Sequence, residues 1–134
     1  MDNVSFILTK NELEVMELLW TLDRALSRSE IIEFSPERSW KKSSVHILLN
    51  SMLNKSAIKV DGYVRTGKNY GRTYSAAVTR EEYQVIQFKY GMPPLTKSSA
   101  IADLISALIM DEDIDDETLD KLEATLQARR DEKK

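Results

Sequence analysis

The same four-residue signal recurs three times in this chain and marks where three helices begin. It reads Thr9-Lys-Asn-Glu12, Ser27-Arg-Ser-Glu30 and Thr79-Arg-Glu-Glu82. In such a capping box, the hydroxyl group and the carboxylate satisfy amide groups that the first helical turn leaves without partners. The sequence therefore predicts helices over residues 9–22, 27–34 and 79–90. The second helix ends before Pro36, because the residue that precedes a proline avoids the helical region.

Between the second and third signals, a longer amphipathic helix is followed by a hairpin. The helix is expected to begin near Lys41–Ser43 and to end near Lys55, and its apolar stripe consists of Val45, Leu48, Leu49, Met52 and Leu53. Alternation of apolar and polar residues predicts strands over residues 58–66 and 72–77. The segment 67–71 contains two glycines and is predicted to form the turn between them.

Two more helices are predicted in the last third of the chain. Residues 97–110 form an apolar amphipathic segment, and the acidic run 111–116 is expected to form a turn and the start of the last helix. We expect the apolar stripes of both helices to be buried in a symmetric homodimer, with packing onto the N-terminal half as the alternative. These stripes consist of Ile101, Leu104, Ile105, Leu108, Ile109, Leu119, Leu122 and Leu126.

Positive charge is concentrated on the central helix and hairpin. Residues 38–72 hold eight basic side chains and one acid, Asp61, so this segment has a net charge of +7 in a chain whose formal net charge is −3. A basic helix that precedes a basic hairpin is the arrangement that a winged-helix DNA-binding domain uses. The expected fold is therefore mainly α-helical with a small antiparallel β-hairpin. It comprises a winged helix-turn-helix domain at residues 1–78 and a helical dimerisation domain at residues 79–134.

The order of residues resembles the penicillinase and methicillin-resistance repressors, the BlaI/MecI/CopY group. The resemblance rests on Leu8-Thr9, Glu12, Val15-Met16 and Leu19-Trp20, on the run Trp40-Lys-Lys-Ser-Ser-Val45 with Leu49, Leu53 and Lys55, and on Arg72-x-Tyr74. It covers about residues 6–78, and weaker similarity continues through the C-terminal helices.

This resemblance implies a dimeric transcriptional repressor whose winged helix binds an inverted-repeat operator. Several members of the group are inactivated by a regulatory protease that cuts at an Asn-Phe pair in the C-terminal domain. Here the corresponding position is Ala107-Leu108, and the cysteines of the copper-responsive branch are also missing. The inducer is therefore left open: a protease acting elsewhere, a small ligand or a partner protein.

The residues expected to contact double-stranded DNA lie at the start of the central helix, on its polar face and in the hairpin. Lys41, Lys42 and Ser43 are expected to bind phosphates, and Ser44 lies beside them. Asparagine pairs with adenine and isoleucine can contact a thymine methyl group, so base edges are assigned to His46, Ile47 and Asn50. Ordinary exposure is the alternative for His46 and Ile47. The hairpin contributes Arg65, Lys68, Asn69 and Arg72, although Arg72 could instead pair with Asp61.

Composition argues against several other classes of protein. The chain has no cysteine and a single histidine, which argues against disulfides, thiolate or histidine metal clusters and a Ser-His-Asp triad. We therefore expect no catalytic residue, no metal and no cofactor. No apolar run approaches the ~20 residues of a membrane span, and residues 1–10 do not resemble a secretory signal, so a cytoplasmic bacterial protein is expected. A winged-helix module that binds proteins rather than DNA is the main alternative function.

Overall fold

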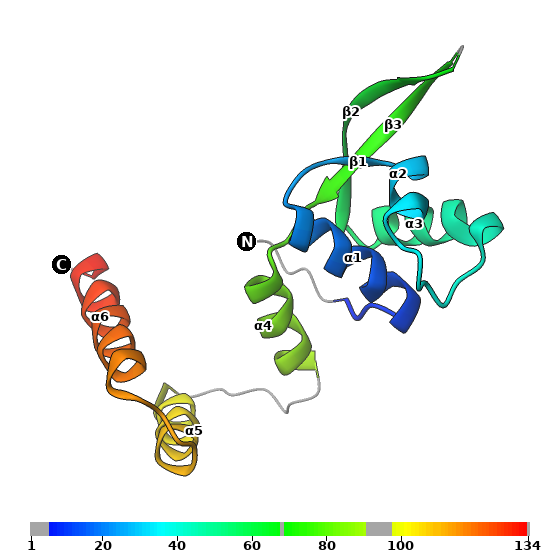
Figure 1. Cartoon of the computed structure of the whole chain (residues 1–134). Helices are drawn as coiled ribbons and strands as arrows, with labels where there is room; N and C mark the ends of the chain where they lie inside the picture. Colours follow the sequence, from blue (N-terminus) through cyan, green and yellow to red (C-terminus); the bar gives the residue numbers. More distant parts are fainter. Residues whose placement is uncertain (1–5, 68, 91–97, 134) are drawn as a thin grey trace. The chain divides into compact units, whose positions relative to one another are not determined.

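The computed structural model describes residues 6–67, 69–90 and 98–133, and the chain divides into two compact units, residues 1–92 and 93–134. Three helices and a three-stranded sheet open the first unit (Figure 1). In chain order these are α1 (Lys10–Leu22), β1 (Leu26–Ser27), α2 (Arg28–Glu33), a 3-10 turn (Lys42–Ser44), α3 (Val45–Asn54), β2 (Ile58–Thr66) and β3 (Asn69–Ala76). A fourth helix, α4 (Arg80–Tyr90), follows.

The capping boxes form as predicted at the starts of α1, α2 and α4. Thr9 and Glu12 exchange hydrogen bonds at α1, with the Thr9 N–H donating to Glu12 Oε1 at 2.8 Å. Ser27 and Glu30 do the same at α2, and the Thr79 N–H donates to Glu82 Oε1 at 2.8 Å at α4. Sequence-local hydrogen bonds therefore fix three helix starts before any tertiary contact is considered.

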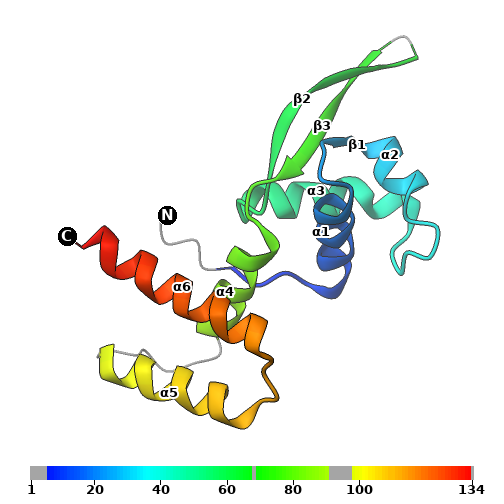
Figure 2. The same ribbon diagram turned by 60° about the vertical axis from the view of Figure 1, so that its left-hand side comes forward.

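The antiparallel sheet has the order β1-β3-β2, so the two-residue strand β1, which the sequence did not predict, pairs with β3. The register of β2 and β3 shifts at Asp61, between the pairs Val60–Tyr74 and Gly62–Thr73. Residues 69–71 were expected in the turn but belong to β3, because Asn69 already pairs with Thr66 and Gly67 adopts a φ of 65° directly after β2. In both ribbon views the hairpin extends away from the helices (Figure 2).

One hydrophobic core lies between the helices and the base of the sheet. It also includes residues of α4, so the first compact unit continues past the predicted boundary at residue 78. The Trp20 indole N–H donates to the Val78 carbonyl at 2.9 Å, and the Tyr83 ring lies 5.8 Å from the Phe6 ring. The fully or nearly fully buried members are Val15, Met16, Leu19, Leu26, Ile31, Trp40, Val45, Leu49, Met52, Ala57, Ile58, Val78, Tyr83 and Ile86.

The second unit consists of two helices, α5 (Ser98–Asp111) and α6 (Asp116–Glu132), close to the predicted ranges. Asp115 caps α6 by accepting a hydrogen bond from the Thr118 N–H at 2.8 Å. Within the described part of this unit, no side chain is fully buried. Four of the predicted stripe residues remain half-buried and four are exposed; Ile101, Ile105, Leu108 and Leu126 are 43%, 48%, 48% and 65% exposed. Among the helices that the structure describes, none is both long and apolar enough to cross a membrane.

Candidate nucleic-acid interface

The two faces of α3 have opposite character, as the sequence predicts. Val45, Leu49 and Met52 are buried in the core. His46, Ile47 and Asn50 are exposed on the other side, and Ile47 has 62% of its surface in solvent. An isoleucine this exposed contributes little to the core, whereas on a polar helix face it is available to a partner.

The residues before α3 form a 3-10 turn rather than the start of the helix that was expected near residues 41–43. Lys41 is extended, Lys42–Ser44 form the turn, and the Ser44 N–H donates to the Lys41 carbonyl at 2.9 Å. Lys41, Lys42 and Ser43 are exposed, and Ser44 is half-buried. Both lysines therefore lie at the surface where the exposed face of α3 begins.

The loop that leads to these lysines is fixed by polar contacts with α1. The Ser39 N–H donates to Glu14 Oε1 at 3.1 Å, and the Ser39 hydroxyl donates to Asn11 Oδ1 at 2.8 Å and also to the Glu14 carboxylate. These bonds from Ser39 lower the pKa of Glu14, chiefly through the hydroxyl. The next residue, Trp40, is buried in the core. Lys41 and Lys42 thus follow a segment that is anchored to α1 by Ser39 and to the core by Trp40.

Two basic residues of the segment 38–72 are engaged in contacts within the protein and are therefore not free to bind a partner. Arg38 donates to the Ser35 carbonyl at 3.0 Å and lies 5.4 Å from the centre of the Trp40 ring. Lys55 forms an ion pair with the buried Glu12 at 2.5 Å. The net charge of +7 in the sequence therefore overstates the positive charge that is free to meet a polyanion.

The contacts around Glu12 favour its ionised form. Burial raises its pKa, but the hydrogen bonds from Lys55, from the Ser51 hydroxyl and from the Thr9 N–H outweigh that effect. The net result is a pKa below the ordinary value of a glutamate.

The hairpin presents one face rich in tyrosine and arginine. Tyr63 is paired with Arg72 across the strands, and Arg65 is paired with Tyr70, so all four side chains share a face. Both arginines are exposed, and the two tyrosines are 67% and 70% exposed. Tyr63 is thus a surface residue as well as a cross-strand partner.

Three predictions for the hairpin remain, which concern Lys68, Asn69 and the possible ion pair of Arg72 with Asp61. Asn69 is exposed, whereas the side chain of Lys68 lies outside the described residues. Asp61 accepts a hydrogen bond from the Ser75 hydroxyl at 3.3 Å, and in the described part of the chain no ion pair joins it to Arg72. Arg72 is therefore available at the surface.

Arg28 was missed by the sequence analysis. It is exposed, and it lines one groove together with Lys42, Ser43 and His46 at the start of α3. It also lines a second groove with Gly71 and Arg72 of β3. Arg28 thus connects the α3 surface with the hairpin. Arg28 lies inside the capping box of α2, so the sequence suggested only a role at the start of that helix. The packing of α2 places Arg28 beside α3 and β3.

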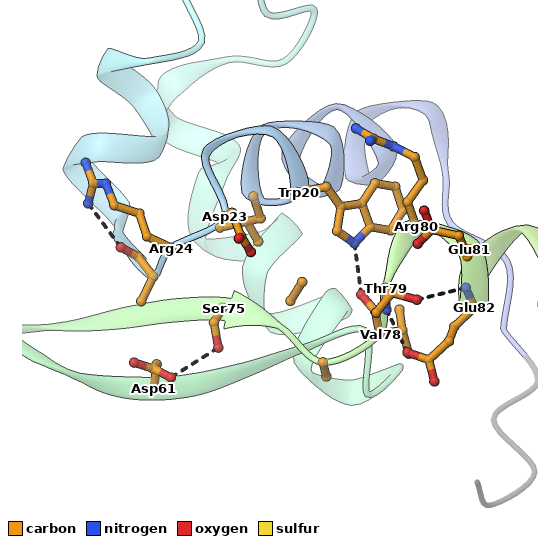
Figure 3. A pocket seen from close by; sticks show the side chains of 14 residues that line it. Trp20, Asp23, Arg24, Asp61, Ser75, Val78, Thr79, Arg80, Glu81 and Glu82 are labelled. Carbon is orange, nitrogen blue, oxygen red and sulfur yellow. Dashed lines mark hydrogen bonds between the residues drawn. The ribbon is translucent and has the colours of Figure 1, made fainter.

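A cavity of about 520 Å³ lies at the base of the hairpin, between the end of α1 and the start of α4 (Figure 3). Its polar side chains largely satisfy one another. Arg80 extends over the Trp20 ring at 5.4 Å and pairs with Glu17 at 2.7 Å, while Thr79 and Glu82 are engaged in the α4 capping box. These contacts account for how α4 is attached to the helix-turn-helix core.

Residues 8–128 match the family described as penicillinase repressor. The chain belongs to the penicillinase repressor family. An uncharacterised 16.5 kDa protein encoded in the ptsI 3′ region of Latilactobacillus sakei is 29% identical over 80 residues, which are 60% of this chain and 50% of that protein. The match thus spans half the length of this relative.

Two solved structures are more distantly similar. Bacillus subtilis PadR in complex with operator DNA is 17% identical, with a TM-score of 0.45 over 76% of this chain and 60% of that chain. A MepR mutant from a multidrug-resistant S. aureus clinical isolate is 13% identical, with a TM-score of 0.44 over 93% of this chain and 78% of that chain.

Membership in this family agrees with the winged helix that α1, α2, α3 and the hairpin form in the first unit. The position that corresponds to the Asn-Phe cleavage pair of some repressors is Ala107-Leu108, within α5. Both residues are exposed.

Proposed function

We propose that this protein is a sequence-specific repressor that binds a pseudo-palindromic operator as a homodimer. The observation that carries this proposal is the exposed face of α3, where His46, Ile47 and Asn50 project beside Lys41 and Lys42. Such a face offers hydrogen-bonding and apolar groups for base edges in the major groove, and adjacent cations for phosphates.

The phosphate contacts come from elements on both sides of α3. Lys41, Lys42, Ser43 and Ser44 precede the helix, Arg28 belongs to α2, and the hairpin supplies Arg65, Lys68, Asn69 and Arg72. Contacts at several points along the backbone fix the orientation of a reading helix, and they make affinity strongly dependent on salt.

Dimerisation through the second unit would place two copies of α3 on one DNA molecule. The apolar stripes of α5 and α6 support this proposal, because Ile101, Ile105, Leu108 and Leu126 remain exposed in the single chain. Burying them against a second copy removes apolar surface from water, and a two-fold axis matches an inverted repeat. The half-sites would lie about 34–36 Å apart, or a multiple of this distance.

Release from DNA would follow an inducing signal, which we assign only by class: a protease, a partner protein or a small ligand. Ala107-Leu108 lacks the residues that the known cleavage position uses, so cleavage there is not proposed. Repression of this kind acts on the bacterial chromosome, and we therefore propose a cytoplasmic location.

The experiment that tests the proposal is selection from random DNA, followed by titration of the best and of unrelated sequences. Wild-type protein should select a short inverted repeat and bind it as a dimer. Lys42→Ala should weaken binding to all DNA about equally, whereas Asn50→Ala should reduce the preference for the selected site by roughly 1–3 kcal/mol.

The main alternative, a winged-helix module that binds proteins, predicts a different result. Wild-type protein would then select no sequence and would show little dependence of binding on salt. An Asn50→Ala variant with an unchanged ratio of site to random-DNA affinity would refute the base-reading role of that residue.

A further inference from the structure

A buried carboxylate connects the start of α1 with the end of α3. Glu12 is only 1% exposed. Its Oε1 accepts the Thr9 N–H that caps α1, and its Oε2 accepts the Ser51 hydroxyl of α3 at 2.6 Å. Lys55, the residue that follows α3, completes the site at 2.5 Å from Oε1. A group that serves as a helix cap is thus also a link between two helices.

One peptide group extends this link to α4. The carbonyl of Ile7 accepts a hydrogen bond from Lys55 Nζ at 3.0 Å. The N–H of the same peptide group, on Leu8, donates to the Tyr83 hydroxyl of α4 at 3.0 Å. A single peptide plane therefore lies between the end of α3 and the helix that continues toward the second unit. We call Glu12, Lys55, Tyr83 and the Ile7–Leu8 peptide the polar clamp.

Through the bonds of Ser51 and Lys55 to Glu12, the polar clamp supplies a directional constraint that the other contacts of α3 with described residues lack. Val45, Leu49 and Met52 hold the helix by apolar packing, which is non-directional. Hydrogen bonds weaken steeply when their angle changes, so Ser51 and Lys55 resist both sliding and rotation of α3. Ser51 directly follows Asn50, which belongs to the proposed base-reading face. A small rotation of α3 would displace that face from base edges, while flexible lysines could still reach phosphates.

We propose that Glu12, Lys55 and Tyr83 are positioning residues that set the orientation of α3 for sequence discrimination. The inference rests on the proposed function, since it concerns how the reading face is held. None of the three touches DNA in this proposal. Their loss should therefore reduce the ratio of site to random-DNA affinity and leave the affinity for random DNA nearly unchanged.

The experiment compares full-length variants on the sequence selected by wild-type protein and on random DNA of equal length. Glu12→Gln removes the charge that faces Lys55. Tyr83→Phe removes only the hydroxyl and keeps the ring that contacts Phe6 and Trp20. Glu82→Gln is the matched control, because Glu82 holds the same position in the α4 capping box and has no hydrogen bond or ion pair to α3 among the described residues.

Glu12→Gln should lower the ratio of site to random-DNA affinity by at least about fivefold, because the loss of one base contact has an effect of about this size. Tyr83→Phe should lower the same ratio. Random-DNA affinity should stay within about twofold of wild type, and Glu82→Gln should change neither quantity. Thermal unfolding gives the folded fraction of each variant. If Glu12→Gln fails to fold, Tyr83→Phe carries the test.

Three results would overturn the inference, and they are distinguishable. Equal losses for both DNAs in Glu12→Gln and Tyr83→Phe would show a role in stability alone. An unchanged ratio in both variants would refute positioning while leaving the proposed function intact. If wild-type protein selects no sequence at all, the proposed function fails, and the inference fails with it.

Discussion

The proposed function predicts which lysines and arginines determine the salt dependence of DNA binding. In the proposed dimer, each chain exposes Arg28, Lys41, Lys42, Arg65 and Arg72 around the α3 face. If each contacts one phosphate, these five residues alone give a dimer about ten contacts, and the slope of log affinity against log salt that they produce is about −9. Affinity then falls by about five orders of magnitude between 50 and 200 mM salt.

Lys42→Ala removes one contact per protomer, so the slope should become about −7. Over the same fourfold range of salt, the difference in affinity between wild type and variant should narrow by about tenfold. Fluorescence anisotropy with a labelled duplex, repeated at five or so salt concentrations, measures both slopes directly. Lys121→Ala, an exposed lysine of α6, is the control and should leave the slope unchanged.

Arg38→Ala tests whether a basic residue that serves the fold is also without effect on the salt dependence. Arg38 lies in the same basic segment, but it donates to the Ser35 carbonyl and lies over the Trp40 ring. Its replacement should leave the slope near −9, by the same estimate of about 0.9 per phosphate. The assignment of exposed and structural cations would be refuted if Lys42→Ala kept the slope of the wild-type protein. It would also be refuted if Arg38→Ala changed the slope as much as Lys42→Ala did.

Three further predictions concern stability and assembly. The pKa of Glu12 is lower in the folded protein than the unfolded value of about 4.3, so the contribution of Glu12 to stability is complete above that value. This contribution is lost as the pH falls through the lower folded pKa. Urea unfolding from neutral pH to about pH 3 should show the loss in wild-type protein and a smaller loss in Glu12→Gln. Ser56 has a φ of 62°, so Ser56→Gly should raise the free energy of unfolding by about 0.5–1 kcal/mol, and a lower urea midpoint would contradict this. Ile105→Asp should weaken dimerisation at least tenfold in sedimentation equilibrium by placing a charge in the apolar stripe (about 1.4 kcal/mol per tenfold), whereas Ser106→Asp, also exposed on α5, should not.

The sequence by itself determined those features that depend on neighbours a few residues apart. The three capping boxes need only a hydroxyl group and a carboxylate three residues apart, so the starts of α1, α2 and α4 were predicted correctly. The two faces of α3 follow from helical spacing, and the exposure of Ile47 and Asn50 agrees with it. The penicillinase repressor family was likewise identified from the order of such local signals.

Tertiary structure decided which charges are free and which elements meet. Lys55 and its partner Glu12 are 43 residues apart, and no local pattern distinguishes that lysine from Lys42. The strand β1 exists only because Leu26 and Ser27 lie beside Tyr74 and Thr73, and Arg28 reaches both α3 and the hairpin through the packing of α2. The attachment of α4 to the first unit has the same origin, because the hydroxyl of Tyr83 meets Leu8 across 75 residues. Periodicity and capping describe one element at a time, whereas ion pairing, burial and strand pairing depend on contacts that form only when distant segments pack together.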